Sequence, residues 1–118
     1  LSLAIETESG LQGGADALKR LLASHPETDA IFFAADVMAV GALFECQRRG
    51  WKVPSRVAIA SFDDVDLLRH VVPTITTLRI PREEIGRRSA DMLMARLEGR
   101  AMPKVMDLGF DIIHREST

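Results

Sequence analysis

Two neighbouring carboxylates follow an apolar run in the middle of the chain. Asp63 and Asp64 come directly after residues 57–62, "VAIASF", which have the composition of a buried strand. Asp36 follows the apolar run 30–35, "AIFFAA", in the same way. Acids at such positions bind a metal ion, accept a phosphoryl group, accept hydrogen bonds from a polar ligand, or cap the next helix. One cap does not account for two adjacent acids, whereas for Asp36 a cap and a ligand contact both stay open.

The remaining chemistry-bearing residues argue against metal and phosphoryl chemistry. A phosphoryl-accepting pair requires a further acid at a later strand end, but Asp66 is too close in sequence and Asp91 falls inside an expected helix. The histidines have no ligand spacing: His25, His70 and His114. Cys46 is the only cysteine, which excludes a cysteine zinc site and an internal disulfide. The sequence has no nucleophile with a matching base and no glycine-rich phosphate loop, so we expect no enzyme activity, no metal and no cofactor.

Strands and helices alternate along the chain. Strands are expected at residues 1–5, 30–35, 57–62, 74–78 and 106–115. Helices are expected at residues 11–22, 37–49 and 82–98, with a short one beginning at Val65. This order predicts an α/β fold, a doubly wound and mainly parallel sheet with helices on both faces. Ligands bind outside the carboxyl ends of such strands, where Asp36 and Asp63 lie. A carboxylate there can accept two hydrogen bonds, which suits vicinal hydroxyls of a sugar.

The bulk composition is that of an ordinary globular chain. The 118 residues are enough for one domain, and a formal net charge of -2 gives no electrostatic footprint for nucleic acid. The longest apolar run is far shorter than a membrane span, and a single free cysteine fits a reducing cytoplasm. Because the chain opens without Met on a strand-like stretch, we interpret it as a piece of a longer protein.

Two long stretches resemble the effector-binding region of the lactose-repressor (LacI/GalR) family. They are "AIFFAADVMAVGALFECQRRGWKVPSRVAIASFDD" and "VVPTITTLRIPREEIGRRSADMLMARLEG". The pieces "FECQRRG" and "RIPREEIG" look most like the branch that represses gluconate utilisation. The resemblance implies two α/β subdomains joined by a hinge, as in the type I periplasmic sugar-binding proteins.

The resemblance also implies a division of the chain. Residues 1–79 are then most of the carboxyl-terminal subdomain, residues 80–105 a crossover and a helix of the other subdomain, and residues 106–118 a returning strand and tail. The DNA-binding domain lies outside this chain. Operator DNA is therefore a partner only through that missing part, and a cytoplasmic homodimer is expected.

The family pattern assigns roles to individual residues. Asp63 matches the family aspartate that hydrogen-bonds sugar hydroxyls, while Asp64 is expected to cap and position the short helix. Asp36 matches the acid that follows the family's Asn, and we give it a mainly structural role. Ala35 stands where the family has that Asn, and Ile80 stands where related sugar binders have Gln. These two replacements disfavour a neutral hexose held in the usual way, and the expected effector is a small sugar or a sugar acid such as gluconate.

The helix after Asp36 is apolar on two sides, which suggests that one side covers the sheet and the other meets a partner. The resemblance places the dimer interface on this helix and on the segment 71–73. The residues expected there are Val40, Phe44, Gln47, Val71 and Val72.

The alternative function is a sugar-binding protein of a transport system, which shares the architecture and differs in the sequence that precedes the domain.

Overall fold

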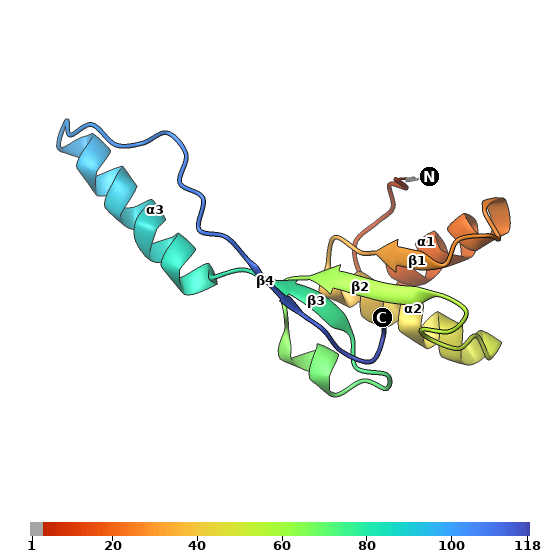
Figure 1. Ribbon diagram of the computed structural model, residues 1–118. Helices are drawn as coiled ribbons and strands as arrows, with labels where there is room; N and C mark the ends of the chain where they lie inside the picture. The colour runs from red at the N-terminus through yellow and green to blue at the C-terminus, as the bar shows by residue number, and fades with distance from the viewer. Residues whose placement is uncertain (1–3) are drawn as a thin grey trace. The chain divides into compact units, whose positions relative to one another are not determined.

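The computed structural model describes residues 4–118, which divide into two compact units. The first unit is Leu1–Arg79 with Ile112–Thr118, and the second is Ile80–Asp111. The helices are α1 (Leu11–Ser24), α2 (Asp36–Arg49) and α3 (Arg82–Leu97), with a short 3-10 helix η1 (Asp66–Arg69). The strands are β1 (Ala30–Phe32), β2 (Ala58–Phe62), β3 (Thr76–Arg79) and β4 (Asp111–Ile113) (Figure 1).

The sheet has the strand order β1-β2-β3-β4. β1 and β3 both pair parallel to β2, with Ala30 opposite Ala58 and Ala60 opposite Thr76. The predicted α/β class with a mainly parallel sheet is therefore confirmed. Because the three strands run in the same direction, their carboxyl ends meet at one edge of the sheet.

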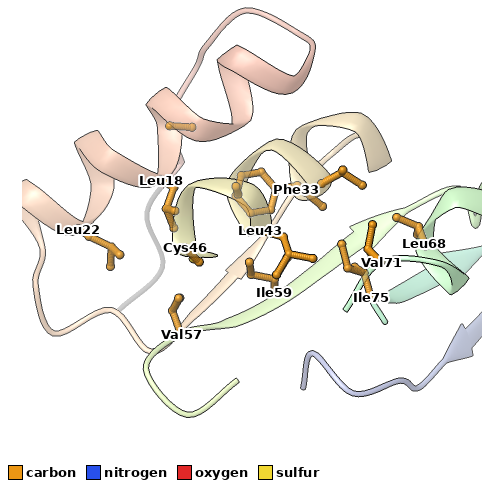
Figure 2. Packing of buried hydrophobic residues seen from close by; sticks show 14 residues of the cluster. Leu18, Leu22, Phe33, Leu43, Cys46, Val57, Ile59, Leu68, Val71 and Ile75 are labelled. Carbon is orange, nitrogen blue, oxygen red and sulfur yellow. The ribbon is translucent and has the colours of Figure 1, made fainter. Parts of the chain in front are cut away.

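One face of the sheet forms the hydrophobic core of the first unit. Val57 and Ile59 point into it from the β2 segment, and Leu43 of α2 packs over them (Figure 2). Leu18 of α1 belongs to the same cluster, so both helices cover this face. Side chains alternate along a strand, and the opposite face of β2 carries half-buried residues: Ala58, Ala60 and Phe62.

Two glycines let α1 and α2 cross in close contact. A Cβ added to Gly14 would lie 1.9 Å from the Met38 carbonyl oxygen, and one added to Gly41 would lie 1.9 Å from the Leu11 carbonyl oxygen. No larger residue fits at either position without moving a backbone. The predicted end of the second helix is confirmed, because Gly50 caps α2 in the left-handed conformation at φ 68°.

Several expected strands differ from the structure. Residues 1–3 of the strand expected at 1–5 lie outside the described residues, and Ala4 and Ile5 are not in a strand. The strand expected at residues 30–35 is shorter, since only Ala30–Phe32 pair, and Phe32 is 55% exposed. The reason is that β1 is an edge strand of the described sheet. The last strand is also shorter than the expected 106–115.

The second unit contains α3 and the segment after it. Ala95 is the one α3 residue that is buried, and large apolar side chains of this unit are exposed. They are Ile85, Leu93, Met94, Leu97, Met102, Val105 and Phe110. In the part of the chain that the structure describes, no helix is both long and apolar enough to cross a membrane.

Candidate functional site

A hollow opens at the edge of the sheet where the parallel strands end. It has a volume of about 490 Å³. Its lining residues come from the segment between β1 and the start of α2, and from the end of β2 through η1: Ala34, Ala35, Asp36, Val37, Phe62, Asp63, Val65 and Leu67. Asp63, Asp36 and Ala35 therefore border the same space. The fourth expected ligand residue, Ile80, belongs to the second unit and does not line this hollow.

Asp63 lies on a strained turn beside this hollow. Its φ is 123° and that of Asp64 is 58°, which makes them two consecutive non-glycine residues with positive φ. Each such residue costs roughly 1–3 kcal/mol and persists only where the surrounding structure holds it, most often at a functional site. The Asp63 amide donates a hydrogen bond of 2.8 Å to the Leu78 carbonyl. The turn thus fixes the half-buried Asp63 directly after β2.

Asp36 acts as a buried brace for the same turn. It is the first residue of α2, not the residue before the helix, and the cap position Ala35 makes no side-chain bond. Its carboxylate accepts hydrogen bonds from the Ser61 hydroxyl at 2.5 Å, the Val65 amide at 2.8 Å and the Thr77 hydroxyl at 3.4 Å. The cap interpretation is therefore wrong, because the carboxylate bonds to the strand ends instead of to its own helix.

Asp64 is held by arginines from three segments. Its side chain is only 2% exposed, and its carboxylate lies 2.5 Å from Arg115, 3.1 Å from Arg69 and 4.0 Å from Arg79. Burial raises the pKa of Asp64, but hydrogen bonds from Arg115 and Arg69 outweigh it, so the pKa lies below its ordinary value. The carboxylate stays ionised near neutral pH.

The predicted cap role of Asp64 is also wrong. Val65 occupies the cap position of η1, and no side chain caps that helix. Asp64 instead pairs with Arg69, the last residue of η1, so it fixes the far end of this short helix. Arg69 lies 5 residues from Asp64 in the sequence, whereas Arg115 lies 51 residues away.

The residues expected at a dimer interface do not form one surface. Phe44 is 43% and Val72 75% exposed, and the exposed Gln47 donates a hydrogen bond of 2.7 Å to the Val72 carbonyl. Val40 is fully buried and Val71 is 8% exposed, both within the core. The assignment of Val40 to an exposed surface is wrong, because α2 is covered by the sheet on one side and by α1 on another.

Sequence reasoning missed three residues that hold the site. Ser61 and Thr77 are buried hydroxyls that face Asp36, and Arg115 is the 11% exposed partner of Asp64. A signal for Ser61 existed, since it is the one polar residue in an otherwise apolar strand. Arg115 is 51 residues from Asp64, and no local pattern connects the two.

A second hollow, of about 660 Å³, runs along β1 and α1 and is lined by apolar residues and two threonines. It has no charged side chain to orient a polar ligand, so the hollow beside Asp63 is the better candidate. Within residues 4–118, no three His, Cys, Asp or Glu side chains converge on a point where a metal ion could bind.

The fold and this strand-end site define the class of protein. Residues 3–118 match the sequence model of the family described as periplasmic binding protein-like domain. The chain is 42% identical over 106 residues to the HTH-type transcriptional regulator GntR of Pseudomonas aeruginosa, a match that covers 89% of this chain and 31% of the relative.

Solved structures that are similar to this chain are also transcriptional regulators. A LacI family transcriptional regulator from Bifidobacterium animalis is similar with a TM-score of 0.89 and 31% identity, over 97% of this chain and 42% of that one. A complex of the transcriptional regulator CelR with cellobiose has a TM-score of 0.85 and 32% identity, over 95% and 35%. The chain belongs to the family described as periplasmic binding protein-like domain, and the relative and solved structures that it resembles are transcriptional regulators. It spans about a third of the length of the curated relative.

Proposed function

We propose that this chain is the effector-binding portion of a transcriptional repressor and that the hollow beside Asp63 holds the effector. The observation that carries this proposal is the strained turn at Asp63, which presents a carboxylate at the carboxyl end of β2. A carboxylate without a metal suits hydroxyl donors, because each oxygen can accept more than one hydrogen bond. The site is assigned a binding role and no catalytic reaction.

The effector is a small sugar or sugar acid such as gluconate. Asp63 accepts hydrogen bonds from its hydroxyls, and apolar lining residues such as Phe62, Val37 and Leu67 pack against its C–H groups. A related regulator has been solved with cellobiose, which supports a carbohydrate ligand. Ala35 provides no polar side chain in this hollow, which favours a ligand whose remaining polar groups are bound by other parts of the protein.

The full-length protein is a cytoplasmic homodimer that binds operator DNA through a separate domain. Phe44, Gln47 and Val72 form the exposed part of the dimer surface. The segment 80–105, with α3, belongs to a second subdomain, which accounts for the exposed apolar side chains of α3. The alternative of a transport sugar-binding protein is disfavoured, because the matched relatives are transcriptional regulators.

The test uses the full-length regulator and a fragment of its own upstream DNA. Gluconate and glucose are each titrated into the protein by calorimetry, and operator binding is then measured with and without the sugar that binds. The proposal predicts that one of these compounds binds and changes operator affinity. If neither these sugars nor other sugars and sugar acids alter operator binding, the effector role is wrong.

A further inference from the structure

Residues 115–118 are joined to the sheet by hydrogen bonds. Ser117 is fully buried between β2 and β3, where its hydroxyl donates to the Ile59 carbonyl at 2.5 Å and accepts from the Thr76 amide at 2.9 Å. Its backbone carbonyl accepts from the Ile59 amide at 3.0 Å, and its amide donates to the Thr74 carbonyl at 3.0 Å. The tail is therefore fixed to both strands.

This anchor holds Arg115 in one place. The Arg115 amide donates to the Thr76 hydroxyl at 2.9 Å, and its guanidinium donates to the Ile75 carbonyl at 2.8 Å and to the Asp64 carboxylate at 2.5 Å. A guanidinium has its donors in a rigid fork, so two fixed acceptors define its orientation. Arg115 thereby sets the position of the Asp64 carboxylate.

Asp64 shares a peptide bond with Asp63, and both residues have positive φ. Such a turn relaxes unless its neighbours hold it. We propose that Arg115 is a positioning residue for the effector site, which holds the Asp63 carboxylate in its binding orientation by fixing Asp64. This inference rests on the proposed effector role of Asp63. It assigns a function in ligand binding to a tail residue that does not line the hollow.

The test compares variants of the full-length regulator titrated with gluconate. Arg115→Gln gives a shorter, uncharged side chain that keeps an amide donor but loses the charge-assisted bond to Asp64, so we expect about tenfold weaker binding. Arg115→Lys retains the charge and should recover part of that affinity. Arg48→Gln is the matched control, since Arg48 is 69% exposed and pairs with Glu45 away from the site. It should bind like the parent.

A double variant separates positioning from general destabilisation. If Arg115 acts through Asp63, then adding Arg115→Gln to Asp63→Asn should weaken binding no further than Asp63→Asn alone. An additive loss would overturn the positioning role. Normal gluconate binding by Arg115→Gln, together with loss of binding by Asp63→Asn, would also overturn it and leave the proposed function intact. Gluconate binding that withstands Asp63→Asn would instead contradict the site itself.

Hydrogen exchange gives a readout that needs no ligand. The Asp63 amide bonds to Leu78 and the Val65 amide to Asp36, so both report on the turn. In Arg115→Gln these two amides should exchange faster, whereas the amide of Phe33, the residue after β1, bonds to the Ala60 carbonyl of β2 and should not change. Unchanged exchange at Asp63 and Val65 in the folded variant would overturn the proposal.

Discussion

The carboxylate of Asp36 lies 2.5 Å from the hydroxyl of Ser61, and this bond joins the start of α2 to β2 beneath the candidate effector site. The same carboxylate accepts the Val65 amide from the chain beyond the strained turn. Asp36 is 4% exposed and Ser61 is fully buried, so removing the Asp36 carboxylate would leave the Ser61 hydroxyl without its acceptor in a dry environment. The brace under the turn therefore contributes to stability as well as to the geometry of the site.

Replacing Asp36 by Ala should destabilise the protein strongly. The change leaves the buried Ser61 hydroxyl and the part-buried Val65 amide without their acceptor, and an unsatisfied buried donor costs about 1–3 kcal/mol. We expect the free energy of unfolding to fall by about 2–4 kcal/mol in urea denaturation. Asp66→Ala is the control, because the Asp66 side chain is 81% exposed and should change stability little. Equal stability of the two variants would contradict the brace.

The close crossing of α1 and α2 predicts a severe effect of one added methyl group. Gly41→Ala would place its Cβ 1.9 Å from the Leu11 carbonyl, so the helices must separate and the core must open. We expect a loss of about 3 kcal/mol or more, measured by thermal unfolding. Gly86→Ala in α3 is the matched control. Nothing lies within 4 Å of its added Cβ, so it should be neutral or stabilising by about 0.5–1 kcal/mol.

The sequence predicted the features that a short local pattern of residues encodes, such as a buried strand or the end of a helix. The run 57–62 predicted β2, the helix expected at residues 37–49 corresponds to α2, and the two apolar runs placed Asp36 and Asp63 at the carboxyl ends of strands, where they border one hollow. These features depend on residues that are close together in the chain, so periodicity and turn chemistry are enough to find them.

The errors concern contacts between distant segments. Val40 was assigned to an exposed side of its helix, because the position of α1 over α2 is not encoded within α2 itself. Asp64 was assigned to a cap, because its partner Arg115 lies 51 residues further along the chain. Acids after a strand have several common roles, and only the tertiary structure distinguishes a cap from a brace or an ion pair.

Acid should weaken the contribution of Asp64 to stability. Its arginine partners lower the pKa below the ordinary value of 3.8, so the folded state favours the ionised carboxylate. The stabilisation is fully present above pH 3.8 and is lost as the pH falls below it, through the lowered pKa of the folded state. The difference in unfolding free energy between the parent and Asp64→Asn should be constant near neutral pH and shrink in this acid range. A constant difference throughout would contradict the ion-pair account.

The proposed dimer surface predicts different outcomes for two residues of α2. Phe44→Glu places a charge on an exposed side chain, so it should give a folded monomer of the full-length regulator with weakened operator binding, because a dimer contacts two half-sites. Val40→Ala removes core methyl groups and should cost on the order of 2 kcal/mol without changing the oligomeric state. Sedimentation and urea unfolding measure the two effects. Unchanged dimerisation of Phe44→Glu would remove this surface from the interface.

The most direct test of the effector site is calorimetric titration of gluconate into full-length Asp63→Asn and Asp66→Asn. Asp63 borders the hollow, whereas Asp66 lies three residues further on at the start of η1, is exposed and does not line the hollow. Charge-assisted hydrogen bonds contribute about 1.5–3 kcal/mol, so Asp63→Asn should bind the sugar acid at least tenfold more weakly while its operator affinity without effector stays unchanged. Asp66→Asn should bind like the parent. Parent-like binding by Asp63→Asn would contradict the proposal that this carboxylate holds the effector.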